Sequence, residues 1–570
     1  MPYKQGIDRK QLMMCSLDCF VGQTSIVRVI DAFVKGMDLE EMGFARIKAA
    51  KEGRPAYETE GLLGLHLYGS RKGVRSSRKL DEACRINVEV KWLMNGLEPD
   101  FRTISDFRKD NIDCMKKVFK AFNKKLSEVL TQGFKSVDGS KFQAGNSKDN
   151  NFTANKLDDR IEWLNQYSEE YLRQLEEMDK LDEEAELSGQ FTREEIEEKL
   201  KSTQERLELY KSYRDYMEEK GLSQLSLIDL DAKLMKSKNG YMVSYNVQTV
   251  VDSETHLIDD FLTTDRVTDH SLLYETMREQ KETSGDEIIE ATAYQGYQSP
   301  EDIVKCLENG IIPHVSMSLG QSTYELETPH EENEITEEMK NSKTTENLKK
   351  CLRAGIIPTA YERAIEAIEV IEKKQFIRDR SAETNSPYGT TEEMILRAKS
   401  GFFVRDPERN LVYCPAGATL RKKSILKNDA TRYINKLACS RCKFRDKCIN
   451  GKSPWKEIDF HKDTLEKANQ NWIKAVGGAL APQNTKKRGH FEKVKLVRIT
   501  FRPDRTKINE RKCISEHPFG TIKRTMNASY FLLRGKKKVD GEVALMCLGY
   551  NMIVAKNLLG FDKLMQAMAT

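Results

Sequence analysis

The stretch 286-DEIIEATAYQGYQSPEDIVK-305 decides the fold class, because it reads as an apolar strand followed directly by a helix. A Gly-Tyr turn ends the strand, and Ser299 with Pro300 predicts the first turn of the helix. A strand end of this kind is a common position for a catalytic carboxylate. Tyr294 and Gln295 occupy that position here, so the function of this strand end has to be explained from the rest of the chain.

Further strands flank this unit along the sequence. The segment 241-YMVSYNVQTVVD-252 has the period of two that is typical of a strand, and strands are also predicted in 131–144, 256–265 and 311–317. We expect the first of them to end at Asp138-Gly139. The order is strand, helical insert, three strands, helix and strand, which predicts an RNase H-like α/β core with its first and fourth strands side by side. The apolar residues placed on one face of 241–252 are Tyr241, Val243, Tyr245, Val247 and Val251.

The chain is predicted to contain four segments: a helical N-terminal DNA-binding domain, the first part of the core, an insertion, and the C-terminal part of the core. Their ranges are 1–130, 131–318, 319–490 and 491–570. Three smaller features lie within them: a helical hairpin at 156–222, a mobile polar loop at 320–347 and a Cys-rich module at 405–455.

Charge is distributed unevenly along the 570 residues, whose formal net charge is +4. The segment 156–220 holds 21 acidic and 11 basic residues, a net of −10, which leaves +14 for the remainder. Its apolar residues have helical spacing on both sides of Ser188-Gly189, which predicts a coiled-coil-like hairpin. This hairpin could pair protomers or pack on its own body. A basic remainder fits a protein that binds a polyanion, although a solvated surface has the same composition.

Residues 1–130 have the apolar spacing of several short helices. Ser76 or Ser77 can cap one helix and Thr103 another. Helices with basic turns are typical of a helix-turn-helix-like DNA-binding unit, and the alternative is a helical bundle with a basic surface. The basic residues expected to meet phosphates are Arg71, Lys72, Arg75, Arg78 and Lys79.

The N-terminal residues MPYKQGIDRK do not resemble a signal peptide. The most apolar segment, 542–561, is interrupted by Asn551, Lys556 and Asn557, so we expect a buried helix and not a membrane span. Twelve cysteines without a secretory signal predict a reducing compartment.

Two separated carboxylates are candidates for a metal-dependent site. In an RNase H-like core, acids on the first strand, the fourth strand and a late helix can hold two Mg²⁺ or Mn²⁺ ions for attack on phosphorus. Asp138 fits the first position and Glu516 the late helix, where the following Pro518 suits a first helical turn. Lys523 lies seven residues further on and could grip a phosphate.

These residues belong to motifs that resemble bacterial insertion-sequence transposases of the DDE type. The motifs are 68-YGSRKGVRSSRKLDEAC-84, 138-DGSKFQAGNSKDNNFT-153, 245-YNVQTVVDSETHLI-258, 405-RDPERNLVYCPAG-417 and 516-EHPFGTIKR-524. The resemblance implies metal ligation by Asp138 and Glu516, with Lys523 at the matching lysine, whereas Asn509 and Lys512 replace the family's usual Tyr and Arg. It also implies cleavage and transfer of double-stranded DNA at the element's terminal repeats, a target DNA, a homodimer on DNA, no membrane, and a cytoplasmic, nucleoid-associated location.

The important departure from the family lies in the opening stretch. The family typically reads Ala-Asp-Lys-Gly-Tyr where this chain reads 293-AYQGY-297, so the second catalytic Asp falls at Tyr294. A tyrosine with a pKa near 10 is a poor Mg²⁺ ligand, and its presence should slow cleavage by about a thousandfold or more. The chain is therefore a decayed transposase, a DNA-binding protein without cleavage, or an enzyme with a substitute acid. The acids considered as substitutes are Asp265, Asp269 and Glu290.

Four cysteines form a separate candidate metal site. Cys439, Cys442 and Cys448 have the spacing C-x2-C-x5-C, and Cys414 supplies a fourth thiol. Four thiolates suit a structural Zn²⁺, a [4Fe–4S] cluster needs the same number, and unligated thiols are the third interpretation. Basic residues surround the group: Arg421, Lys422, Lys423, Arg441, Lys443 and Arg445.

Overall fold

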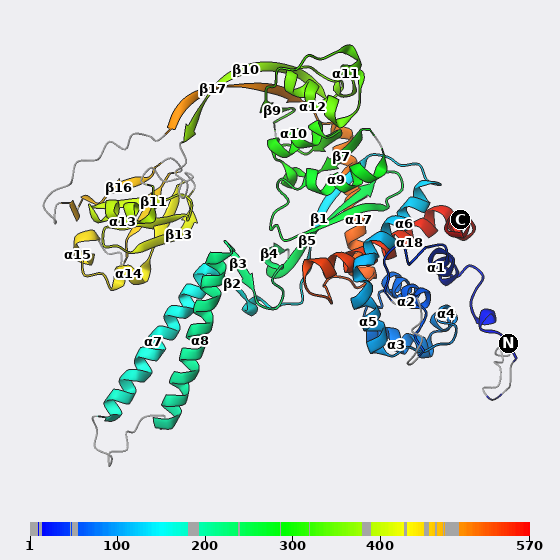
Figure 1. Cartoon of the computed structure of the whole chain (residues 1–570), viewed down its shortest axis with the longest axis horizontal. Helices are drawn as coiled ribbons and strands as arrows, with labels where there is room; N and C mark the ends of the chain where they lie inside the picture. The colour runs from blue at the N-terminus through cyan, green and yellow to red at the C-terminus, as the bar shows by residue number, and fades with distance from the viewer. Residues whose placement is uncertain are drawn as a thin grey trace, which may run out of the picture. The chain divides into compact units, whose positions relative to one another are not determined.

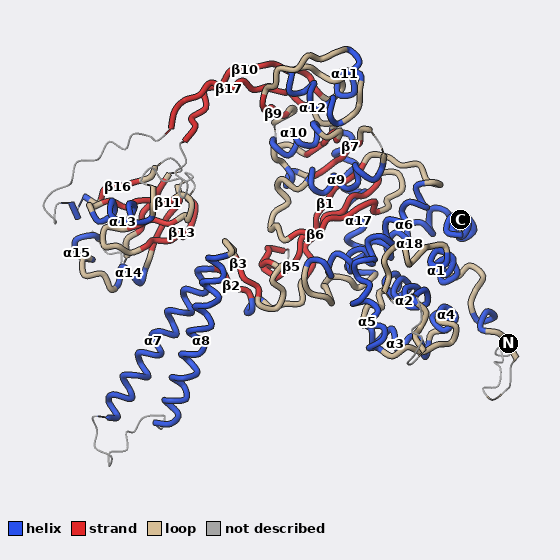
Figure 2. The backbone as a smooth tube through the Cα atoms, viewed as in Figure 1, coloured by secondary structure: helices blue, strands red, loops and turns tan. Residues whose placement is uncertain are grey.

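A computed structural model of the chain contains two compact units (Figures 1 and 2). One unit contains Met1–Glu369 and Val497–Thr570, and the other contains Val370–Leu496. The structure describes residues 10, 14–45, 47, 55–179, 193–237, 240–285, 287–318, 320–378, 389–426, 430–449, 455–461, 464–470, 472–473 and 489–569.

A mixed six-stranded sheet forms the centre of the first unit, with the order β4-β5-β1-β7-β8 and β6 paired to β5. Strands β5 and β6 are antiparallel to their neighbours, whereas β1, β7 and β8 run parallel. The expectation that the first and fourth strands lie side by side is confirmed, since β1 pairs with β7. The strands are β1 (Lys135–Gln143), β4 (Lys233–Ser237), β5 (Gly240–Asp252), β6 (Ile258–Thr264), β7 (Ile289–Ala293) and β8 (Ile311–Val315).

Asp138 lies in the middle of β1, so the prediction that the strand ends at Asp138-Gly139 is wrong. An Asp-Gly pair usually favours a turn, but here β5 pairs along the whole of β1 and keeps it extended. The parallel pairing with β7 reaches Ser136 and Thr292, just before Asp138. Asp138 therefore lies where β1 and β7 diverge. Gly139 permits close contact there, because a Cβ atom at this residue would lie 2.3 Å from the side-chain nitrogen of Gln248.

Both faces of the sheet are buried. Val251 packs into a core shared with the N-terminal helices, while the adjacent Val250 packs into a core shared with α9 (Leu273–Ser284) and α10 (Pro300–Glu308). Alternate residues of a strand point to opposite faces, so these two valines mark two layers of core. Of the five residues predicted to share one face of β5, Tyr241 differs because it is exposed.

Helix α10 begins as predicted, with Pro300 in its first turn and the Ser299 side chain accepting a hydrogen bond from the Asp302 N–H. Helix α17 (Arg505–Gly520) packs against β1, β5, β7 and β8. The prediction that Glu516 lies in a first helical turn is wrong. Asp504 caps this helix, so Glu516 and Pro518 lie in its second half, and a π-helical turn, η6 (Thr521–Thr525), follows. A π turn is a known accommodation of a disrupted helical hydrogen-bond ladder.

Six helices precede the sheet and share a core with the long C-terminal helix α18 (Lys536–Ala569). By length and composition α18 is the one described helix that could cross a membrane, but most of its apolar window is buried in the fold, as the sequence predicted. Helix α5 is capped by Asp100 and not by Thr103, because the helix begins three residues earlier than predicted. The six helices are α1 (Ile26–Lys35), α2 (Thr59–Lys72), α3 (Ser77–Ile86), α4 (Val88–Leu93), α5 (Phe101–Asn111) and α6 (Met115–Ser127).

The predicted hairpin is present as two helices, α7 (Ala154–Asp179) and α8 (Arg193–Glu219), which pack against each other. The short strands β2 (Asn151–Thr153) and β3 (Gln224–Ser226) pair at its base. Its predicted turn at Ser188-Gly189 lies outside the described residues.

The segment predicted as a mobile loop at 320–347 contains ordered elements instead. Its apolar residues Tyr324 and Leu326 are buried, and they anchor a strand that the Glu-rich composition concealed. The elements are β9 (Tyr324–Pro329), α11 (Glu337–Asn341) and the start of α12 (Thr345–Ala354), and β9 joins a sheet with β10 (Ile365–Arg378) and β17 (Gly489–Phe501).

The second unit is built on its own six-stranded sheet, with the order β15-β14-β13-β12-β11-β16. Its described elements are α13 (Thr391–Lys399), β11 (Phe402–Asp406), β12 (Leu411–Tyr413), β13 (Thr419–Ile425), β14 (Thr431–Ile434), α14 (Lys436–Ser440), α15 (Arg445–Cys448), β15 (Glu457–Phe460) and β16 (Glu466–Ala468).

Candidate functional site

Asp138 is the centre of the candidate site. Burial raises the pKa of its carboxyl group to about 6, against the hydrogen bond from the Gly139 N–H at 2.8 Å and the charge of Arg511. Asp269 and Glu516 raise this pKa further by repulsion. Asp138 and Glu516, which are 378 positions apart in the sequence, are thus close enough to interact electrostatically.

Lys523, in η6, contacts β1. Its ammonium group donates to the Ser140 hydroxyl at 2.6 Å and to the Lys141 carbonyl at 2.7 Å, and it lies 4.3 Å from the centre of the Phe142 ring. The three residues that Lys523 contacts follow Asp138 in β1 by two to four positions, so the ammonium group is held near Asp138. The Glu516 side chain is exposed on α17, which packs on the same strand.

Tyr294, directly after β7, is bound to Asp269. Its hydroxyl donates to one Asp269 carboxylate oxygen, and the other oxygen accepts from Lys141 at 3.1 Å, Asn246 at 2.7 Å and Gln248 at 2.9 Å. Burial alone would raise the pKa of Asp269, but these hydrogen bonds outweigh it and hold the pKa below its ordinary value. Burial and Asp269 raise the pKa of Tyr294, so its hydroxyl stays protonated.

Arg511 covers this pair from α17. Its guanidinium carbon lies 5.6 Å from the centre of the Tyr294 ring, and the side chain is buried. Among the described residues, the Arg511 Nε atom has no hydrogen-bond partner. A buried donor without a partner is costly, so this guanidinium marks the part of the site where an anion would be most favourable.

Sequence reasoning missed the support for Asp269. Asn246 and Gln248 alternate along β5 between the apolar residues of 241–252, and that alternation was the available signal. Of the three acids considered as substitutes at Tyr294, Asp265 pairs with Lys233 at 2.6 Å and Glu290 pairs with His314 at 2.8 Å. Asp269 is the one that contacts Tyr294.

The five predicted phosphate-binding residues have different surroundings. Arg75 is largely buried, pairs with Glu542 of α18 and donates to the Tyr530 carbonyl at 2.6 Å, so it links helices of the fold and is not open to DNA. Lys72 pairs with Glu89 at 3.5 Å. Burial lowers the pKa of Arg71. Arg78 and Lys79 are exposed in the first turn of α3.

A hollow of about 460 Å³ lies at the start of α3. Its lining includes Arg78, Ser76, Ser77 and Arg102, and the two guanidinium groups lie 5.4 Å and 5.9 Å from the Phe101 ring centre. Helix N-termini with hydroxyl and guanidinium donors are suited to phosphate. Arg102 is a candidate contact that the sequence did not single out.

The four cysteines of the second unit, Cys414, Cys439, Cys442 and Cys448, line one cavity. Burial raises the pKa of both Cys414 and Cys448. Within the described ranges, no group of three or more His, Cys, Asp or Glu side chains is positioned to hold a metal ion, either at this cavity or around Asp138.

Residues 15–110 match the family model of a transposase domain, DUF772. This match supports a transposase family for the chain. It covers helices α1 to α4 and most of α5, including the hollow at Arg78. No curated protein and no solved structure matches the chain.

The raised pKa of Asp138 predicts a pH-dependent stability. The unfolded chain releases this proton near pH 3.8 and the folded chain near pH 6, so the stability contributed by the neutral carboxyl is complete below pH 4 and is lost as the pH rises through 6. Asn cannot ionise. We expect Asp138→Asn to be about 1–2 kcal/mol more stable than the native chain at pH 8 in EDTA, with no difference at pH 4. Urea unfolding at the two pH values checks this, and a variant that is less stable at pH 8 contradicts it.

Proposed function

We propose that the chain is a DDE-type transposase with an RNase H-like core, whose DNA cleavage and strand transfer are slowed by Tyr294. The observation that supports the proposal is the packing of α17, which carries Glu516, against β1, which carries Asp138 where β1 and β7 diverge. The transposase-domain match in the N-terminal helices supports it independently.

Asp138 and Glu516 are the residues that would hold Mg²⁺ or Mn²⁺. When bound, the ions activate a water or a 3′-hydroxyl and stabilise the leaving oxygen. The fit is incomplete, because the third acid in reach, Asp269, already accepts hydrogen bonds from four side chains. Arg511 and Lys523 contribute positive charge beside Asp138, where they would orient a scissile phosphate.

A second function is a transposase-derived protein that binds DNA without cleaving it. The contact between Tyr294 and Asp269 favours this alternative. The Asp269 carboxylate accepts a hydrogen bond from the Tyr294 hydroxyl, so it is not free to replace the missing metal ligand. Both functions include binding to double-stranded DNA at the element's ends, with a homodimer on that DNA, and only the first includes target joining.

DNA binding is expected to depend on the hollow at α3. Replacing Arg78 and Arg102 with Ala should weaken binding to double-stranded DNA, because each guanidinium that meets a phosphate also releases counterions. The slope of log K against log salt should fall by about one for each phosphate that the variant no longer neutralises. Fluorescence anisotropy at several salt concentrations measures both quantities.

The matched control is Lys349→Ala, which removes an exposed cation from α12 in the same unit. It should leave affinity and salt slope unchanged. Equal losses per removed charge in the control and in the Arg78 and Arg102 variant would mean that net charge, and not this hollow, determines binding.

A further inference from the structure

The four cysteines that surround one cavity come from separate elements of the second unit. Cys414 directly follows β12, Cys439 lies in α14, Cys442 lies between α14 and α15, and Cys448 ends α15. The cavity has a volume of about 250 Å³ and a mainly apolar lining that includes Phe403 and Trp472. Trp472 packs edge-on against Phe444, with their ring centres 4.7 Å apart.

A hydrogen-bond donor of the chain is directed at one of these sulfur atoms, that of Cys448. The Asn469 side-chain nitrogen donates to the Cys448 sulfur at 3.1 Å. A thiol needs no such donors to pack in a core, whereas a thiolate is stabilised by them.

The turn after β12 is shaped to present Cys414. The Gly417 N–H donates to the Cys414 carbonyl at 2.9 Å, and Gly417 has a φ of 84°, which an L-residue rarely adopts. The Cys414 N–H in turn donates to the Ala418 carbonyl at 2.9 Å. This tight turn places Cys414 at the wall of the cavity that residues of α14 and α15 also line.

We propose that Cys414, Cys439, Cys442 and Cys448 hold one structural Zn²⁺ as four thiolates, with Asn469 supporting Cys448 from outside the metal shell. Four sulfur ligands fill a tetrahedral Zn²⁺ and leave no position for a substrate, so the ion stabilises the fold and does no chemistry. In the described part of the chain these four thiols are not positioned to hold an ion. Binding must therefore draw α14 and α15 toward β12 and release protons.

Zinc should consequently determine whether α14 and α15 are fixed to the sheet of the second unit. The proposal is independent of DNA cleavage, because every ligand lies between Val370 and Leu496 and the acids of the candidate site do not.

The test uses the full chain, purified without chelator and analysed for metals. We expect about one equivalent of zinc per chain, falling below roughly half an equivalent when any one of the four cysteines is replaced by Ser. The matched control Cys15→Ser removes an exposed thiol of the first unit and should retain the zinc. Less than half an equivalent in the native chain, even after refolding with zinc, overturns the proposal, as does stoichiometric iron with sulfide.

Two measurements remain informative if a Ser variant does not fold. Titration of the native chain with a mercurial thiol reagent should release zinc in proportion to the thiols modified, and release of none overturns the assignment. Asn469→Leu should keep the stoichiometry but weaken zinc binding by about 10–100-fold in competition with a chelator, because outer-shell partners typically contribute that much. Unchanged affinity would remove Asn469 from the site.

Discussion

Replacing Tyr294 with Asp should give the chain a Mg²⁺-dependent DNA cleavage activity at least about a thousandfold above that of the native chain. The substitution removes the hydroxyl that donates to Asp269 and places a carboxylate at the end of β7, beside Asp138. A carboxylate there can ligate a divalent ion, whereas a protonated tyrosine cannot. Nicking of DNA that carries the element's ends, in Mg²⁺ or Mn²⁺, measures the gain.

Binding of the ions can be checked apart from cleavage. Without divalent ions, Asp at 294 adds a third negative charge near Asp138 and Asp269, so the variant should unfold at a lower temperature than the native chain. Mg²⁺ should restore its melting temperature and have little effect on the native chain.

Two controls make the result specific. Tyr294→Phe keeps the ring and loses the hydroxyl, so it should not gain activity. Asp138→Asn in the Tyr294→Asp background should abolish the gain. Native cleavage as fast as that of Tyr294→Asp would contradict the role assigned to Tyr294, and cleavage that survives Asp138→Asn would remove the site assignment.

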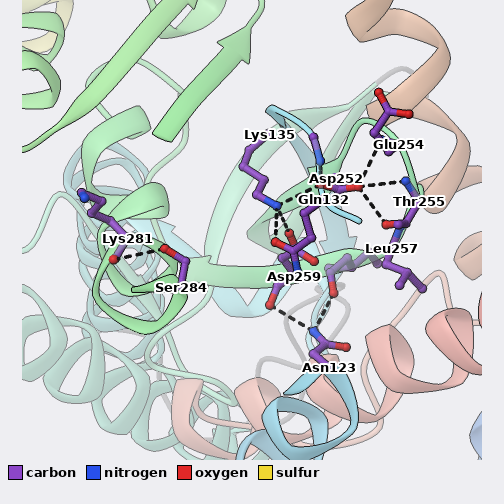
Figure 3. Close-up of polar contacts among 12 residues, drawn as sticks. Asn123, Gln132, Lys135, Asp252, Glu254, Thr255, Leu257, Asp259, Lys281 and Ser284 are labelled. Carbon is purple, nitrogen blue, oxygen red and sulfur yellow. Dashed lines mark hydrogen bonds and ion pairs between the residues drawn. The ribbon is translucent and has the colours of Figure 1, made fainter. Parts of the chain in front are cut away.

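Lys135→Met should cost about 3–5 kcal/mol of unfolding free energy, because it leaves two buried carboxylates without their cation. The Lys135 ammonium lies 2.9 Å from Asp252 and 2.6 Å from Asp259, and Figure 3 shows it between the two carboxylates. Lys135 is 2 % exposed, Asp252 0 % and Asp259 9 %, so solvent cannot replace the lysine. Unfolding in urea, followed by circular dichroism, gives the difference.

The pH dependence identifies the cause of this loss. Burial raises the pKa of Asp259 to about 6 even beside Lys135, so acidification neutralises it and should reduce the deficit of the variant between pH 8 and pH 5. Lys135→Met with Asp259→Asn should recover part of the stability. The control Lys35→Met, whose exposed ammonium pairs with Asp31 at 2.9 Å, should change stability by less than about 0.5 kcal/mol. Equal effects at Lys135 and Lys35 would contradict the argument.

The strand and helix pattern was predictable where local chemistry agrees with the fold. Ser299-Pro300 predicts α10, and the alternation in 241–252 predicts β5, because capping and binary patterning act over a few residues. The prediction that a strand ends at Asp138-Gly139 is wrong because here local chemistry disagrees with the fold. The local turn preference of these two residues is overridden by pairing with β5, which is about 110 positions away in the sequence and is a tertiary effect.

The acids of the candidate site could be named from motifs, but their partners could not. Asp269 lies in a segment with no strand or helix pattern of its own, and its importance depends on Asn246, Gln248 and Tyr294, which other parts of the chain supply. Arg75 shows the same limit, because a basic turn in the sequence does not reveal that Glu542 of the last helix is its partner.

The position of α18 at the C-terminus has a consequence for folding during synthesis. The Ser70 hydroxyl binds the Leu545 carbonyl across 475 positions, and Arg75 reaches Glu542 across 467. At a synthesis rate of about 5–20 residues per second, the ribosome adds Leu545 roughly 25–95 s after Ser70. Until α18 is made, the apolar residues of the first helices that pack against it remain exposed to solvent on the nascent chain. Chaperones or residual structure must protect this surface during that time. A fragment that ends before residue 536 should therefore be recovered mainly as aggregate.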